Sequence, residues 1–148
     1  MTRSYKIPRS VLVIVHTPDL QALLLERADH PGFWQSVTGS QDECETFVQS
    51  SYRELKEETG LDACQYPLLD WELEYEFEIF EQWRWRYAPG ITRNTEHVFS
   101  LRVPRPLDIR LAPKEHLSYL WLPHDRAADR VFSWSNAAAL RALPERAA

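Results

Sequence analysis

The stretch "RELKEETG", Arg53 to Gly60, has the form of a helix end whose charges oppose the electrostatics of a helix. Glycine is favoured just past a helix C-terminus, where the macrodipole is partially negative and Lys or Arg suits the last turn. Here Glu54, Glu57 and Glu58 occupy that turn. Their spacing also makes the carboxylates neighbours that repel one another, at a cost of roughly a few tenths of a kcal/mol per pair. The pattern therefore indicates a missing positive partner.

A hard divalent cation would offset each of these costs. Clustered carboxylate oxygens are typical ligands of Mg²⁺ and Mn²⁺, with water and substrate phosphates completing the coordination. The alternative explanation is a solvated acidic helix end, which surface helices often have.

The helix that carries the glutamates is predicted to begin at Thr46 and to end at Gly60. Thr46 with Gln49 fits a capping box, and Gly60 fits the position after the last turn. An apolar stripe at helical spacing predicts the buried face. Its members are Val48, Tyr52, Leu55 and Thr59.

Read from Gly39, the sequence has five residues, Glu45, seven residues and then "RELKEETGL" (53–61). This spacing resembles the Nudix box of the Nudix hydrolase family without a mismatch at the defining positions: Gly39, Glu45, Arg53, Glu54, Leu55, Glu57, Glu58, Gly60 and Leu61. The resemblance implies an α/β protein, an α/β/α sandwich around a central mixed β-sheet. It also implies a hydrolase that acts on a nucleoside diphosphate linked to another group.

The resemblance assigns a role to each residue of the box. Glu54, Glu57 and Glu58 are the implied metal ligands and catalytic carboxylates, with Mg²⁺ as the cofactor and Mn²⁺ as a substitute. Gly39 permits a tight turn that brings a backbone carbonyl near the metal. Catalytic support is expected from Arg53, which would pair with Glu45 and hold the loop–helix–loop shape.

Phosphoanhydride hydrolysis also needs an activated water molecule. Glu58 is one candidate base, but many Nudix proteins use a carboxylate in a later loop. Glu115, in "APKEHLSYLW" before a predicted strand, is the best such residue and is expected to act as metal ligand or base. The alternative is an exposed loop acid.

The rest of the chain predicts strands followed by a helix, more strands and a final helix. Apolar runs predict a strand pair at 11–15 and 22–26, and a loop with a short strand follows at 30–40. Further strands are expected at 96–103 and 116–122, and a helix at about 125–143. Because the order lacks regular βαβ alternation, we expect a mixed sheet with helices packed on it.

The clearest strand is "WELEYEFEIF" (71–80), in which apolar and acidic residues alternate strictly. "WRWRY" (83–87) alternates with arginines and is predicted to form the second strand of a hairpin. Glu78 would then lie opposite Arg84, and Glu76 opposite Arg86, while Phe77 and Ile79 would face Trp85 and Trp83. A second metal site along the glutamate row is an alternative explanation of the same residues.

Composition bounds the remaining possibilities. The chain has 148 residues, enough for one domain, which we expect to span 1–148. A net charge of −5 gives no reason to expect nucleic acid or anionic membrane as a partner. The apolar run 11–15 is too short for a secretion signal or membrane span, so a cytoplasmic protein is expected. Cys44 and Cys64 are expected to be free thiols; the oligomeric state stays open.

Four stretches outside the box resemble a Nudix branch that cleaves dihydroneopterin triphosphate in folate synthesis: "FWQSVTGS" (33–40), "FEIF" (77–80), "YAPGITRNTE" (87–96) and "SWSN" (133–136). The resemblance implies release of pyrophosphate from that small-molecule triphosphate, leaving the monophosphate. Such a ligand needs aromatic walls for its flat ring and cations for its phosphates. The implied substrate contacts are Lys6, Arg27, Trp34, Thr38, Phe77, Glu78, Ile79, Phe80 and Ser133.

Several alternatives stay open at this stage. Phe77 also belongs to an apolar face that a core would cover. Pterin and guanine present similar edges, so dATP or oxidised dGTP is an alternative substrate. A catalytically silent, nucleotide-binding Nudix domain is a third hypothesis, although the complete glutamate set argues against it. The last is an acidic module that binds calcium or a basic partner.

Overall fold

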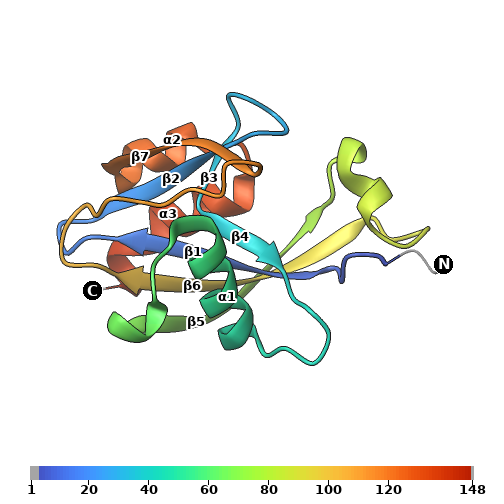
Figure 1. Cartoon of the computed structure of the whole chain (residues 1–148), viewed down its shortest axis with the longest axis horizontal. Coiled ribbons are helices and arrows are strands. Elements are labelled where there is room, and N and C mark those ends of the chain that lie inside the picture. The colour runs from blue at the N-terminus through green and yellow to red at the C-terminus, as the bar shows by residue number, and fades with distance from the viewer. Residues whose placement is uncertain (1–3, 148) are drawn as a thin grey trace.

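The fold is built around one mixed β-sheet with helices packed against it (Figure 1). The computed structural model describes residues 4–147 of the chain. Within this range the sheet has seven strands: β1 Arg9–His16, β2 Gln21–Arg27, β3 Trp34–Gln35, β4 Val37–Ser40, β5 Leu68–Glu78, β6 Arg93–Arg102 and β7 His116–Pro123. The helices are α1 Phe47–Thr59, α2 His124–Arg130 and α3 Trp134–Arg146, with the short 3₁₀ helices η1 Ala63–Gln65 and η2 Glu81–Arg86.

β1 lies at the centre of the sheet, and its residues 11–15 are at most 1% exposed. It pairs in parallel with β6 on one side. On the other side it pairs antiparallel with β4 and, where His16 lies opposite Ala22, with β2. β5 extends the sheet beyond β6, while β3 and β7 pair with β2. The expected mixed sheet and the expected pairing of the first two strands are confirmed.

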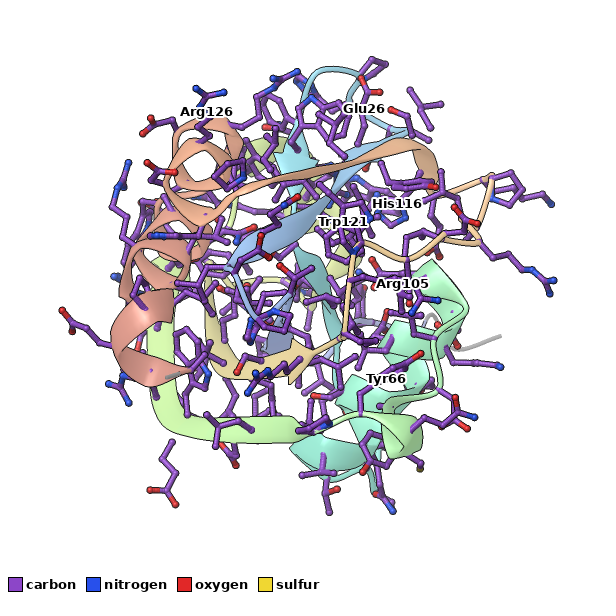
Figure 2. All side chains as sticks on the ribbon, turned by 90° about the vertical axis from the view of Figure 1, so that its left-hand side faces the viewer. Glu26, Tyr66, Arg105, His116, Trp121 and Arg126 are labelled. Atoms are coloured by element: carbon purple, nitrogen blue, oxygen red, sulfur yellow. The ribbon has the colours of Figure 1, made fainter. Side chains whose placement is uncertain are left out.

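Helices cover both faces of the sheet. Because side chains alternate along a strand, the odd-numbered residues of β1 pack on the side of α1, and the even-numbered residues pack on the side of α2 and α3. In Figure 1 α1 lies in front of the strands. Trp121 and Tyr66, both labelled in Figure 2, pack against the cluster on the α1 side. The two clusters make the expected α/β/α sandwich.

The predicted boundaries of α1 are confirmed, but half of its predicted buried face is wrong. Thr46 and Gln49 form the capping box, and Gly60 has φ 76° in the left-handed region. Val48 and Tyr52, however, are 41% and 38% exposed. The helix is rotated so that small and acidic side chains face inward, because its acidic edge forms a wall of a cavity. The buried residues are Ser50, Ser51, Glu54, Leu55, Glu58 and Thr59.

The prediction of a strand at 83–87 is wrong, since residues 83–86 belong to η2 and Tyr87 directly follows it. β5 pairs with β6 rather than with its immediate successor in the chain. Glu76 accordingly accepts from Arg93 of β6, with Nε and Oε1 2.7 Å apart, and not from Arg86. The acidic residues of β5 could pair with the arginines of 83–87 or with those of β6. The strand pairing with β6, which is the longer of the two, is the one that forms.

One expected contact survives this change of structure. Arg84 donates to Glu78 at 2.8 Å, because the 3₁₀ turn also brings the two side chains together. Phe77 pairs with Asn94 of β6 instead of facing Trp85, and Trp85 is 61% exposed. Trp83 instead stacks on Phe80, with ring centroids 5.3 Å apart.

The expected C-terminal helix is divided into α2 and α3 by residues 131–133. Ser133 caps α3 by accepting from the amide of Asn136 at 3.2 Å. The break places residues 132–134 beside a cavity described below.

Two expectations from composition are also addressed by the structure. Cys44 and Cys64 are exposed free thiols. Among the helices of residues 4–147, none has the length and apolar character needed to span a membrane.

Candidate active site

Two cavities meet beside β4. The larger, of about 750 Å³, is lined mainly by charged and polar side chains. The smaller, of about 160 Å³, has a mainly apolar surface, which aromatic and aliphatic side chains supply among polar ones. The residues that line both are Lys6, Arg27, Gln35, Thr38, Gly39, Ser40 and Arg86. A ligand with an anionic chain on a flat ring can therefore occupy both cavities at once.

The three glutamates of α1 line the polar cavity together with Gly39 and Glu115. Glu58 is 2% exposed, and neither of its carboxylate oxygens receives a hydrogen bond of good geometry from residues 4–147. Burial raises its pKa well above the ordinary value, and the charges of Glu54 and Glu115 raise it further. Burial and the Glu54 charge also raise the pKa of Glu57. The cavity thus concentrates negative charge with too few donors to stabilise it.

Gly39 makes room for one of these carboxylates. The residue lies opposite Val11 in the ladder between β1 and β4. A Cβ atom at this position would overlap the carboxyl group of Glu54. Glycine is therefore required here for close approach between the strand backbone and the acidic helix.

Arg53 ties the loop before α1 to the helix. Its Nε and Nη2 donate to the two oxygens of Glu45, at 2.7 and 3.0 Å, and Nη2 also donates to the carbonyl of Ser40 at 2.9 Å. Nη1 donates to Glu54 at 2.7 Å. The hydrogen bonds from Arg53 lower the pKa of Glu45 to about 2. The expected pair of Arg53 with Glu45 is present, and it orients Glu54 as well.

Cations lie between the two cavities. Arg27 donates to Asp29 through Nε and Nη2 at 2.7 and 2.8 Å, and Arg86 donates to the same carboxylate at 3.1 Å. The pKa of Asp29 falls to about 2, mainly through the hydrogen bonds from Arg27. Desolvation and the Arg86 charge lower the pKa of Lys6. Two arginines thus share one carboxylate, and Lys6 lines the same two cavities, an arrangement of positive charge that suits a polyanionic ligand.

Aromatic rings enclose the apolar pocket. Phe80 and Trp83 stack on each other, and Phe132 meets both rings edge to face at 5.5 and 5.8 Å. The predicted contacts Phe77, Glu78, Ile79, Phe80, Thr38 and Ser133 all line this pocket. Trp34 does not: it lines neither cavity, is 8% exposed and packs in the core under Arg130. Its apolar ring completes the cluster on the α3 side, so the structure separates it from the other predicted contacts.

Comparison with known proteins identifies the family. The NUDIX domain family matches residues 6–143. The chain belongs to this family. A NUDIX relative from Escherichia coli K12, named dihydroneopterin triphosphate diphosphatase, is 48% identical over 139 residues, which are 92% of this chain and 91% of the relative.

Two further comparisons agree with the first. A Haemophilus influenzae protein of the same name is 40% identical over 140 residues, or 93% of this chain and 87% of the relative. The solved structure of the E. coli dihydroneopterin triphosphate pyrophosphohydrolase has a TM-score of 0.88 at 47% identity, and the match covers 94% of this chain and 96% of that chain.

The NUDIX carboxylates fit a hard divalent cation by their chemistry. As placed, no three His, Cys, Asp or Glu side chains of residues 4–147 converge on one point. Glu57 is exposed at the edge of this cavity, on a flexible side chain that can reach further into it. Glu58 supplies two buried oxygens without adequate donors, and Gly39 keeps Glu54 at the cavity wall. Carboxylate oxygens with room for water are the donor set that Mg²⁺ and Mn²⁺ take.

His116 lies beside Glu58 in this NUDIX site and was not predicted from the sequence. It begins β7, is labelled in Figure 2, and places Nε2 3.5 Å from Glu58 Oε1. Burial and the Arg27 charge lower its pKa to about 4, so the ring is neutral near pH 7. A neutral ring cannot offset the charge of Glu58 by an ion pair.

Other residues of the NUDIX site were also missed. Arg86 and Trp83 were predicted to belong to a strand, so their position at the cavity was not predicted. Asn94 and Glu96 line the apolar pocket from β6. The sequence pattern could have indicated Asn94 and Glu96. Polar residues at alternate positions, on the face of a strand that otherwise points into the core, predict a buried polar site.

Proposed function

We propose that this protein is a divalent-metal-dependent pyrophosphohydrolase that converts dihydroneopterin triphosphate and water to dihydroneopterin monophosphate and pyrophosphate. The observation that carries the proposal is the union of an acidic cavity, a bank of cations and an aromatic pocket in one continuous site. Relatives of that name cover most of the chain at 48% and 40% identity and support it.

The cations are assigned to the phosphate chain. Lys6, Arg27 and Arg86 line the junction of the two cavities, so a triphosphate lying there would pass from the ring pocket toward α1. Binding of the polyanion relieves the repulsion between Lys6 and Arg86 that lowers the lysine pKa. Arg27 is held by Asp29 and by Gln35 at 3.0 Å, which fixes its guanidinium before substrate arrives.

The carboxylates are assigned to the metal and to water. Glu54, Glu57, Glu58 and the Gly39 carbonyl would hold the cation, and Glu115 acts as a further ligand or as the base. When bound, Mg²⁺ or Mn²⁺ supplies charge neutralisation on the phosphates and lowers the pKa of a bound water. Arg53 keeps Glu54 in place through its hydrogen bond.

The aromatic pocket is assigned to the pterin ring. Phe80 and Trp83 offer a stacked wall, and Ile79 and Phe77 close the apolar floor. Stacking on such rings contributes beyond simple burial because the flat faces match in shape and polarity. The pocket thus accounts for a bicyclic ring rather than for a phosphate chain alone.

We further assign Mg²⁺ as the cofactor, with Mn²⁺ as a substitute, and the cytoplasm as the place of action. The exposed thiols of Cys44 and Cys64 support the latter, because free surface thiols suit a reducing compartment.

The deciding experiment compares kcat/KM for dihydroneopterin triphosphate, GTP and dATP in Mg²⁺ and identifies the released product. The proposal expects pyrophosphate from dihydroneopterin triphosphate with the highest kcat/KM of the three. The Glu58→Gln variant serves as the control for contaminating phosphatases. A preference for dATP would contradict the substrate assignment, and orthophosphate as the product would contradict the reaction.

A further inference from the structure

A carboxylate lies at the point where the phosphate chain is proposed to bind. Asp29, two residues beyond the end of β2, lines the polar cavity together with Lys6, Arg27 and Arg86. Its negative charge opposes the binding of a polyanion there, and its side chain is 35% exposed. An ion pair with that much exposure contributes little to the free energy of unfolding. Stability therefore does not explain why an acid occupies this position.

Asp29 joins two guanidinium groups that come from separate elements. Arg27, the last residue of β2, donates through Nε to Oδ1 at 2.7 Å and through Nη2 to Oδ2 at 2.8 Å. Arg86, the last residue of η2, donates to the same Oδ2 at 3.1 Å. The hydrogen bonds from Arg27 lower the pKa of Asp29 to about 2, so the carboxylate is ionised at neutral pH. Two positive charges that repel each other are therefore held side by side.

The bridge through Asp29 leaves donors of both arginines for a ligand. A guanidinium group has five N–H donors, and Arg27 uses three of them, two on Asp29 and one on Gln35. These bonds leave Arg27 one further N–H on each terminal nitrogen, and Arg86 gives Asp29 a single bond through Nη2. Both arginines line both cavities. They can therefore act together on a phosphate group at the junction while Asp29 keeps them in place.

Further contacts tie this bridge to both cavities. The amide of Ala28 donates to the carbonyl of Glu115 at 2.9 Å, which connects the loop of Asp29 to the residue proposed as metal ligand or base. On the other side, the guanidinium group of Arg27 lies over the ring of Trp83, with Cζ 4.2 Å from the ring centroid. The position of the two arginines is thus set relative to the acidic cavity and relative to the ring pocket.

We infer that Asp29 is a positioning residue that holds Arg27 and Arg86 together as one clamp on the phosphate chain. The inference rests on the proposed function, because it takes a triphosphate as the ligand at the junction. Asp29 acts through the two guanidinium groups and not by contact with the phosphates. Without it, the two positive charges repel each other, and the side chain of Arg86 must be ordered when the substrate binds. Substrate binding therefore weakens when this negative charge is removed.

The sign of the change in KM tests the inference. Asp29→Asn removes one negative charge from the cavity, so a purely electrostatic effect would lower KM for a triphosphate. Positioning predicts the opposite: KM should rise at least ~10-fold, the order expected for one lost hydrogen bond to a charged group, with a smaller change in kcat. Asp29→Ala should act in the same direction, and it places no amide donor against the guanidinium groups. An unchanged or lowered KM in both variants would overturn the inference.

Asp129→Asn is the matched control. It also removes one negative charge, from an exposed pair with Arg141 at 3.1 Å, and it should leave KM and kcat unchanged. Thermal unfolding of the Asp29 variants should stay close to that of the unaltered protein, because the pair is partly exposed. A purely structural role would instead lower kcat through loss of folded protein and leave KM unchanged, and that result would also overturn the inference.

A double-mutant cycle with Arg86→Gln tests whether Asp29 acts through the arginines. Arg86→Gln removes one end of the bridge and leaves the loop of Asp29 unaltered. Asp29→Asn should therefore raise KM by a smaller factor in the Arg86→Gln background than in the unaltered protein. The same factor in both backgrounds would show that Asp29 acts by another route and would overturn the inference.

The two proposals fail separately when dATP is measured beside dihydroneopterin triphosphate. Both substrates carry the phosphate chain that the clamp holds, so Asp29→Asn should raise KM for both. If dATP has the higher kcat/KM and the variant still raises KM for both, the substrate assignment is wrong and the role of Asp29 stands. If dihydroneopterin triphosphate is the better substrate and KM does not rise, the role of Asp29 is wrong and the proposed function stands.

Discussion

At the scale of single residues, Glu58 is the clearest case of a side chain whose position is explained only by something it binds. It is 2% exposed, has Glu54 and Glu115 as charged neighbours, and lies 3.5 Å from the neutral His116 ring. A buried anion in such surroundings is destabilising. Its retention in the site is therefore a functional property rather than a contribution to stability.

Replacing this anion by an isosteric amide separates function from folding. Glu58→Gln should lose more activity than the roughly 10- to 100-fold that removal of an outer supporting partner costs. Without metal it should be at least as stable as the unaltered protein, because the buried charge is gone. Steady-state kinetics and urea unfolding in EDTA measure the two effects. Turnover within a few-fold of normal would remove Glu58 from the mechanism.

Gly39→Ala tests the approach of β4 to α1. The new methyl group would displace the Glu54 carboxyl group, which can move because it is the end of a flexible side chain. The fold should persist while Mn²⁺ affinity and activity fall. If the effect acts through Glu54, Gly39→Ala should cost little more in a Glu54→Gln background. Independent, additive losses in that double-mutant cycle would refute the mechanism.

Glu96 predicts a pH dependence of stability. Burial raises its pKa to about 7, above the ordinary 4.5 that applies to the unfolded chain. Its contribution to stability is therefore present in full below pH 4.5 and is lost as the pH rises through about 7. The free energy of unfolding should fall by about 3 kcal/mol over that window from this group. Urea unfolding of the unaltered protein and of Glu96→Gln should diverge by this amount; parallel curves would contradict it.

The sequence predicted the residues whose spacing is fixed by a helix, whereas Glu96 and Asn94, which the sheet brings to the pocket, were missed. Glu54, Glu57 and Glu58 share one helical edge, so their spacing alone predicted a cluster. Glu96 and Asn94 meet Ser133 and Phe80 only after β6, α3 and η2 are assembled. Trp34 was grouped with the substrate contacts by its type, although its position in the core gives it another role.

At the scale of elements, the loop before α1 and the helix act as one unit through Arg53. The guanidinium joins both oxygens of Glu45, the carbonyl of Ser40 and the carboxylate of Glu54. A planar group with several donors in fixed directions is required for such a pattern. The position of Glu54 therefore depends on the loop as well as on the helix.

Arg53→Lys keeps the charge and removes the fork of donors. The Mg²⁺ concentration needed for half-maximal rate should rise, and kcat/KM should fall by roughly 10- to 100-fold, as for other supporting partners of metal ligands. Arg141→Lys is the control, because Arg141 forms an exposed pair with Asp129 on the helices behind the sheet. Metal titrations of the rate measure both variants. An unchanged Mg²⁺ requirement in Arg53→Lys would show that the fork does not support Glu54.

Helices and strands were predicted correctly where a local sequence pattern determines them. They were predicted wrongly where two segments compete to pair with the same strand. The capping box and Gly60 set the ends of α1, and both were read from the sequence. The segment 83–87 had the alternation of a strand, but β5 found a better partner in β6. Pairing between distant strands is settled by the assembled sheet, which a local charge pattern does not encode.

At the scale of the whole molecule, the site forms where side chains from the two faces of the sheet meet at the end of β4. α1 supplies carboxylates from one face, and α3 with η2 supplies the ring pocket on the other side of β4. Lys6 is tied to η2 by its amide, which donates to the carbonyl of Arg86 at 2.8 Å. The chain start, the middle and the end thus meet at one junction.

This arrangement explains why the family resemblance predicted the catalytic residues more readily than the residues of the ring pocket. The box lies within one continuous stretch, 39–61, so its role is visible in sequence order. The ring pocket draws on segments more than 50 residues apart, such as Phe77 and Ser133. Only the fold shows which of their polar atoms face the same space.

The central claim is that the crowded glutamates of α1 hold a divalent cation against the phosphate chain. An anomalous difference map from crystals soaked in Mn²⁺ tests it most directly. The account predicts peaks within coordination distance of Glu54 and Glu58, at the wall formed by Gly39. A map with no peak there at saturating Mn²⁺, or with manganese bound only elsewhere, would contradict it.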